Sequence, residues 1–164
     1  MLQALTLGLA LLVPAASANT LTDADIQGFY AFDNKAASML HDISDAARAS
    51  AGLRPGECLQ ELADQLTFVV SEFKFVEVMA ELEHGSPAGD TQVKAVLLLR
   101  ADKFLSLLAL DRKAIGTTMG LRTCAVNGSV VAKGQEILRL CDEAGALVGA
   151  ISKKLGKRSS GPLG

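Results

Sequence analysis

The sequence is poor in the side chains from which catalytic and metal sites are usually built. Its 164 residues include no tryptophan, one tyrosine, two histidines and three cysteines. It also lacks an excess of either charge, since 16 lysines and arginines against 18 aspartates and glutamates leave a formal net charge of −2. A nucleic-acid-binding domain normally carries a basic excess. We therefore expect no nucleic-acid partner and no cofactor.

Apolar residues, by contrast, are plentiful. They make up 49% of the chain, while charged residues make up 21%, a balance that argues against global disorder and supports a packed core. The length is that of one domain. A helix needs about 20 predominantly apolar residues to cross a bilayer, and no stretch of the chain is both that long and free of charge. We expect no transmembrane span.

The longest apolar run lies at the start of the chain. Residues 5–13 are almost wholly apolar, and Pro14 and then Ala16-Ser17-Ala18 follow, a small-x-small pattern typical of a secretory cleavage site. This pattern predicts a signal peptide over residues 1–18 and an exported protein, either periplasmic or extracellular. The segment before Leu5 lacks the usual lysine or arginine, and the alternative is an apolar first helix of a cytosolic protein.

Four later segments carry apolar residues three and four residues apart, the spacing of an amphipathic helix. They are residues 22–51, 57–84, 93–115 and 130–155. Thr22 and Asp25 also form the pattern of a capping box at the start of the first segment. Four helices with short connections predict an all-α fold, an up-and-down antiparallel four-helix bundle over residues 19–155. A disordered tail is expected at 156–164.

Two stretches allow a second interpretation. Asn127-Gly128 lies between apolar residues, which is a strong local signal for a β-hairpin, so a small hairpin at 122–133 is an alternative to helix there. Residues 68–79 are rich in valine and phenylalanine, which strands favour. The length and the spacing of that stretch favour a helix.

The bundle topology selects one pairing of the cysteines. Disulfides persist in exported proteins, and three cysteines leave one thiol over. The second predicted helix starts, and the third ends, at the same end of the bundle, which brings Cys58 and Cys124 together. Cys141 would lie roughly 12 to 18 Å further along the axis at 1.5 Å per residue. We predict a Cys58–Cys124 disulfide and a buried free thiol at Cys141.

Charged residues interrupt two of the predicted apolar stripes. Asp33 lies among the apolar positions of the first helix and Arg100 among those of the third, at a similar height in an antiparallel bundle. An isolated buried charge is costly, so we expect a pair between Asp33 and Arg100, or one through a neighbour such as Glu77. Three interpretations are open. The pair is structural, or the first predicted helix is rotated so that Asp33 reaches water instead. In the third, these residues line a polar cleft for an anionic or amphiphilic ligand.

A second apolar face indicates how the protein acts. The second predicted helix carries Phe75 away from its main stripe, and the third carries Leu105 away from its own. A helix that is apolar on two sides is either sandwiched within the fold or meets another molecule. The sequence thus predicts either full burial within the fold, or a binding surface for a second copy or for another exported protein.

No constellation of residues at a meaningful spacing indicates an enzyme or a metal site. Glu81 and His84 form one Glu-x-x-His motif, whereas carboxylate-bridged di-metal bundles use two, together with further glutamates. No serine lies in a GxSxG motif. The sequence predicts a non-enzymatic, exported helical protein that acts by binding or self-association. The alternative is a carrier that holds a small apolar or amphiphilic molecule in the bundle interior.

Overall fold

The computed structural model describes residues 20–87 and 90–156. Within these ranges the chain forms five helices packed against one another, and no strand occurs in them. The helices are α1 (Asp23–Ala49), α2 (Arg54–Gly85), α3 (Thr91–Gly120), α4 (Arg122–Ala125) and α5 (Gly128–Gly156). The all-α prediction is confirmed. The expected signal peptide and nearly all of the expected tail lie outside the described residues.

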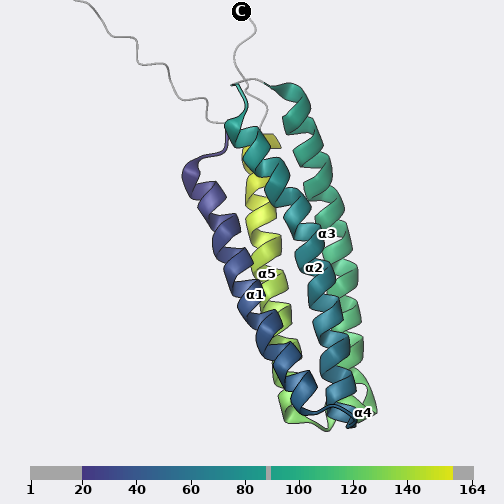
Figure 1. Ribbon diagram of the computed structural model, residues 1–164. Helices are drawn as coiled ribbons and strands as arrows, with labels where there is room; N and C mark the ends of the chain where they lie inside the picture. Colours follow the sequence, from purple (N-terminus) through teal and green to yellow (C-terminus); the bar gives the residue numbers. More distant parts are fainter. Residues whose placement is uncertain (1–19, 88–89, 157–164) are drawn as a thin grey trace, which may run out of the picture.

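The long helices α1, α2, α3 and α5 lie side by side, and consecutive ones run in opposite directions (Figure 1). The most extensive packing joins α1 to α2, α2 to α3, and α3 to α5. The short helix α4 lies at the same end as the connection between α1 and α2 (Figure 1). At the other end, the start of α1 comes close to the ends of α2 and α5. None of the described helices is long and apolar enough to cross a membrane.

Aromatic rings fill the centre of the packing. The Phe73 ring of α2 lies 4.1 Å from the Phe32 ring and 5.3 Å from the Phe29 ring of α1, measured between centroids. It also meets Phe104 of α3 edge-on at 5.7 Å. All four side chains are almost fully buried, and pairs of this geometry contribute beyond their buried area. Phe73 therefore ties three helices together at one level of the core.

The alternative of a small hairpin at 122–133 is wrong, because Asn127 starts a helix there. Its side-chain Oδ1 accepts hydrogen bonds from the backbone N–H groups of Ser129, at 3.1 Å, and Val130, at 3.2 Å. This satisfies N–H groups that a helix start leaves unpaired, the role that asparagine commonly plays as an N-cap. The Asn-Gly pair thus begins α5, and the residues just before it form α4. The capping box of Thr22 and Asp25 is confirmed at the start of α1.

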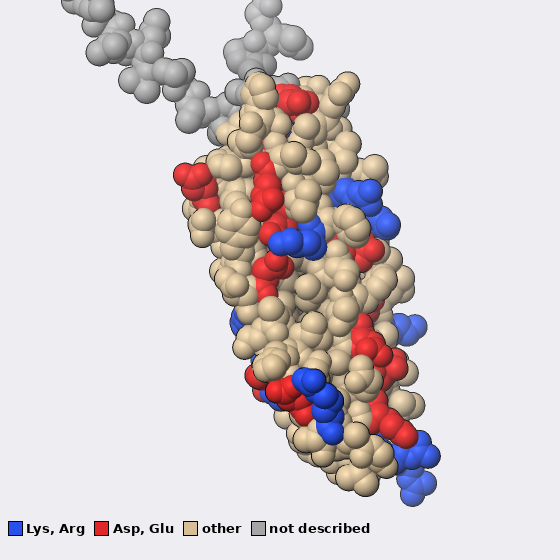
Figure 2. All heavy atoms as spheres, viewed as in Figure 1, with Lys and Arg blue, Asp and Glu red and all other residues tan. Residues whose placement is uncertain are grey.

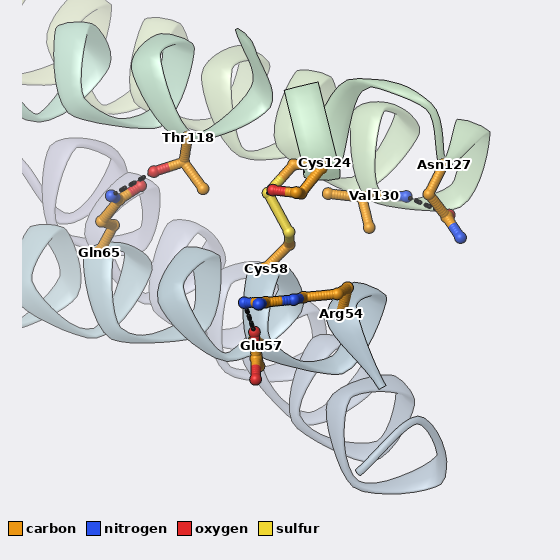
Figure 3. Close-up of a disulfide and its surroundings, with 9 residues drawn as sticks. Arg54, Glu57, Cys58, Gln65, Thr118, Cys124, Asn127 and Val130 are labelled. Atoms are coloured by element: carbon orange, nitrogen blue, oxygen red, sulfur yellow. Dashed lines mark hydrogen bonds and ion pairs between the residues drawn. A yellow bond between two sulfur atoms is a disulfide. The ribbon is translucent and has the colours of Figure 1, made fainter. Parts of the chain in front are cut away.

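The disulfide between Cys58 and Cys124 is confirmed, with a Cα–Cα distance of 5.8 Å. It joins the beginning of α2 to α4, so it fixes α4 against the end of the helices (Figure 3). Further along α2, the Gln65 side-chain amide donates a hydrogen bond to the Thr118 hydroxyl at 3.0 Å, which adds a polar link between α2 and α3. Cys141 is a buried free thiol, also as predicted.

Candidate functional site

Asp33 and Glu77 meet across the contact between α1 and α2, and Lys74 bridges them. The Lys74 Nζ lies 2.7 Å from Asp33 Oδ2 and 2.6 Å from Glu77 Oε1. The Glu77 side chain is 1% exposed and that of Asp33 is 25% exposed, whereas the Lys74 side chain is half exposed. Two carboxylates thus approach one ammonium group at the edge of the core.

The surroundings of this cluster raise the pKa values of both Glu77 and Lys74. Burial raises the pKa of Glu77, the hydrogen bond from Lys74 lowers it, and the charge of Asp33 raises it again, with a net rise. The hydrogen bonds to Asp33 and Glu77 raise the pKa of Lys74. Lys74 therefore stays charged, and the proton that is most easily gained or lost at this site belongs to a carboxyl group.

Arg100 does not take part in this cluster. It is an exposed residue, and its guanidinium carbon lies 5.7 Å from the centroid of the Phe75 ring, a cation–π contact. The predicted pair between Asp33 and Arg100 is therefore wrong, because the buried stripe of α3 passes beside Arg100. That stripe runs through the following residues: Leu97, Ala101, Phe104, Leu108 and Ile115. Asp33 and Glu77 are linked by Lys74, which forms an ion pair with each of them.

Sequence reasoning missed Lys74, although a signal was present. Lys74 precedes Glu77 by three residues, and residues three apart on a helix are neighbours on its surface. A buried glutamate therefore had a cation within reach on its own helix. The long lysine side chain reaches from the exposed side of α2 to the contact with α1. Lysine commonly packs its apolar stem in this way while its charge stays accessible to water.

A mostly apolar groove of about 560 Å³ lies on the surface beside this cluster, between α1 and α2. We call it the α1–α2 groove. It is lined by Asp33, Ala37, Val70, Ser71, Lys74, Phe75 and Val78. Figure 2 shows acidic side chains along the contact of α1 and α2, basic atoms against them, and wide uncharged areas around them. The groove combines apolar walls with an ion-paired rim.

The outer side of α2 exposes a row of large apolar side chains. Phe68, Phe75 and Leu82 follow one another at intervals of seven residues and are 47%, 55% and 53% exposed. Ser71 and Val78 lie between them, so the five positions alternate in steps of three and four. We call these five residues the α2 seam. This spacing keeps all of them on one line along a helix, as in a coiled coil.

Leu105, the α3 residue expected on a second apolar face, is less exposed than Phe75. It is half-buried and packs against the core. The exposed apolar residues on the first half of α3 are instead Val96 and Leu99. The Phe75 side chain, expected on a second apolar face of α2, is 55% exposed.

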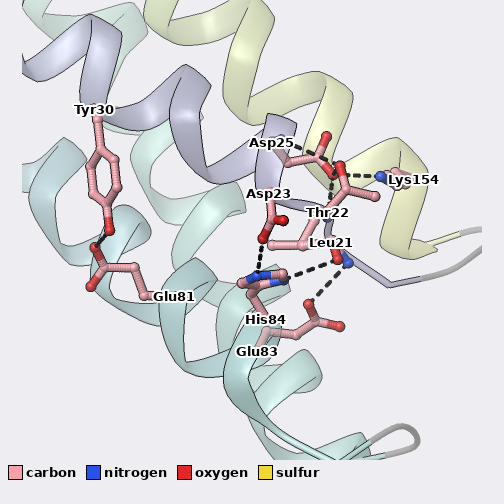
Figure 4. Close-up of polar contacts among 9 residues, drawn as sticks. All are labelled: Leu21, Thr22, Asp23, Asp25, Tyr30, Glu81, Glu83, His84 and Lys154. Carbon is pink, nitrogen blue, oxygen red and sulfur yellow. Dashed lines mark hydrogen bonds and ion pairs between the residues drawn. The ribbon is translucent and has the colours of Figure 1, made fainter.

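Glu81 and His84 do not face a common ligand. Glu81 accepts a hydrogen bond from the Tyr30 hydroxyl at 2.7 Å, whereas His84 Nε2 lies 2.9 Å from Asp23 and Nδ1 lies 3.2 Å from the Leu21 carbonyl oxygen (Figure 4). Both residues thus hold the start of α1 against the end of α2. Among the described residues no group of three or more histidine, cysteine, aspartate or glutamate side chains is placed to hold a metal ion.

The backbone just before α1 is held on both sides. The Leu21 N–H donates to Glu83 at 3.3 Å, and the Leu21 side chain is buried. Lys154 of α5 pairs with Asp25 at the same end (Figure 4). These polar contacts join α1, α2 and α5 at one end of the molecule, and the sequence analysis did not predict them.

Comparison of the chain with protein-family models, with curated proteins and with solved structures finds no match.

Proposed function

We propose that the protein acts by non-catalytic association through the α2 seam, and that its partner there is a second copy of itself. The single observation that carries this is the exposure of Phe68, Phe75 and Leu82 at seven-residue intervals. Large apolar side chains in a continuous exposed row mark interaction sites. Aromatic residues are enriched at the buried centres of protein interfaces.

A second copy fits because the two ends of the α2 seam lie equally far from Phe75. Phe68 lies seven residues before it and Leu82 seven residues after it. A two-fold axis through Phe75 and perpendicular to α2 sets two α2 helices antiparallel, so that Phe75 meets its own copy and Phe68 meets Leu82. Self-complementary contacts of this kind are what a two-fold dimer requires.

We also propose that this dimer forms outside the cytoplasm, in the periplasm or in the extracellular space. The support is the apolar stretch at residues 5–13 with its Ala16-Ser17-Ala18 pattern, and a disulfide, which is typical of oxidising compartments. Cleavage after Ala18 leaves Asn19 as the first residue. Mass spectrometry of the protein purified from its native host tests this directly.

The architecture we assign is the up-and-down antiparallel four-helix bundle, with α4 as an addition at one end. The support is that each long helix packs most on its neighbours in the chain. In this arrangement the outer sides of α2 and α3 are open to a partner.

Replacing Phe75 with serine tests the association. Loss of a central aromatic residue of an interface costs about 2 kcal/mol or more, which is roughly a 30-fold weaker dimer. Val126→Ser is the matched control, because Val126 is even more exposed, at 81%, but lies beside α4 at the end of the molecule. Sedimentation equilibrium should show a dimer for the wild type and Val126→Ser, and a monomer for Phe75→Ser. A monomeric wild type would refute self-association.

The second candidate is a carrier, and the α1–α2 groove favours it. Its walls are mostly apolar and its volume of about 560 Å³ is in the range of small-molecule sites. A ligand that binds only the folded protein raises its thermal stability. Native mass spectrometry of the freshly isolated protein should then show a retained small molecule, and Ser71→Trp, which fills the groove, should abolish it.

A further inference from the structure

The Asp33 and Glu77 carboxyl groups leave one oxygen each without a partner. The Lys74 ammonium group donates hydrogen bonds to Asp33 Oδ2 and Glu77 Oε1. The other two oxygens, Asp33 Oδ1 and Glu77 Oε2, are buried and have no hydrogen-bond partner among the described residues. An unpaired buried polar atom is costly. Two ionised carboxylates cannot remove that cost for each other, because both only accept.

We infer that Asp33 and Glu77 share one proton, held between Glu77 Oε2 and Asp33 Oδ1, and that this proton latches α1 to α2 beside the α1–α2 groove. One proton satisfies both unpartnered oxygens at once, since the protonated carboxyl donates and the ionised one accepts. Burial raises the pKa of Glu77, and the nearby Asp33 carboxyl group raises it further. Glu77, at 1% exposed against 25% for Asp33, is the group that carries the proton.

In the part of the chain that the structure describes, Lys74 is the cation that pairs with Asp33 and Glu77. Glu77 interacts with Asp33 and Tyr30 of α1 and with Lys74 of its own helix. The Tyr30 hydroxyl donates its hydrogen bond to Glu81. Apart from Thr118, the buried residues that α3 and α5 contribute are apolar. Arg100 of α3 lies over the Phe75 ring. When Glu77 ionises, two carboxylates therefore share Lys74 alone.

The latch weakens as the pH rises. Glu77 has a raised pKa in the folded protein, so it contributes stability that is fully present below the ordinary pKa of glutamic acid. That stability is lost as the pH rises through the raised pKa. Lys74 keeps its charge throughout, because its own pKa is raised. Above the transition the Glu77 oxygen has to be hydrated, and the contact of α1 and α2 opens at the Asp33 end of the groove. This inference does not depend on what binds the groove or the α2 seam.

Titration of the side-chain carboxyl carbons by NMR tests the shared proton in the wild-type protein. The Glu77 resonance should titrate at a clearly higher pH than glutamates of the same chain unfolded in urea. Asp33→Asn should shift the Glu77 midpoint down, because the asparagine amide donates to Glu77 and removes the neighbouring charge. A Glu77 midpoint at or below the unfolded value overturns the inference.

The latch itself is tested by Glu77→Gln, whose amide donates to Asp33 Oδ1 and accepts from Lys74 at every pH. Glu61→Gln is the matched control, because it removes the same charge from an exposed position of α2. From mildly acidic pH upward, the wild type and Glu61→Gln should lose thermal stability while Glu77→Gln does not. A Glu77→Gln variant with the pH dependence of the wild type overturns the latch. If that variant does not fold, the wild-type titration decides.

Discussion

Gly56 lies so close to Ser50 that a Cβ on Gly56 would overlap the Ser50 carbonyl oxygen. Gly56 is buried in the first turn of α2, where the chain has just turned back from α1. The obstacle is backbone, held by the hydrogen bond from the Leu53 N–H to the same Ser50 oxygen at 3.0 Å. Glycine is therefore needed here for the close approach of two backbone segments.

Gly56→Ala is expected to destabilise the protein by about 1–3 kcal/mol, the usual cost of forcing extra atoms into a packed site. Gly149→Ala is the matched control. Gly149 lies in the interior of α5 with nothing within 4 Å of an added Cβ, so alanine there should stabilise by about 0.5–1 kcal/mol through its better helix propensity. Urea unfolding of both variants measures the difference. Equal effects of the two substitutions would contradict the close approach.

Some features of the fold and of the candidate site could be predicted from the sequence, and others could not. The apolar spacing predicted the long helices, and chain direction alone paired Cys58 with Cys124, because both follow from local periodicity. Arg100 was predicted to be buried, but the buried stripe of α3 passes beside it. The rotation of α3 about its own axis decides this, and that rotation depends on which helices α3 packs against. A hairpin turn at Asn127 stayed open as an alternative, because asparagine stabilises both turns and helix starts through side-chain hydrogen bonds to the backbone.

Removing the disulfide is expected to cost about 4 kcal/mol on the chain-entropy account, given a sequence separation of 66 residues. The double variant Cys58→Ser and Cys124→Ser should show this loss in urea unfolding under non-reducing conditions. Reduced wild-type protein should behave like the double variant. If the double variant is as stable as the oxidised wild type, the bridge does not contribute to stability.

The thiol of Cys141 is expected to be unreactive in the folded protein. Burial raises its pKa to about 11, so near pH 8 almost no reactive thiolate is present, and the side chain is 0% exposed. A thiol reagent such as Ellman's reagent should label no cysteine in the native protein and one per chain in urea. Rapid labelling of the native protein would mean that α5 opens locally at Cys141.

Cross-linking through Phe75 tests the central claim, the antiparallel pairing of two α2 helices. In a Cys141→Ala background, mild oxidation at a protein concentration high enough to offset the weaker association should trap Phe75→Cys as a disulfide-linked dimer. Phe68→Cys alone should stay monomeric, because its partner position is Leu82, and a mixture of Phe68→Cys and Leu82→Cys chains should form the cross-linked heterodimer. Non-reducing electrophoresis reads all three. Absence of the cross-linked heterodimer from the mixed chains, or cross-linking of Phe68→Cys to itself as fast as of the mixed pair, would contradict the account.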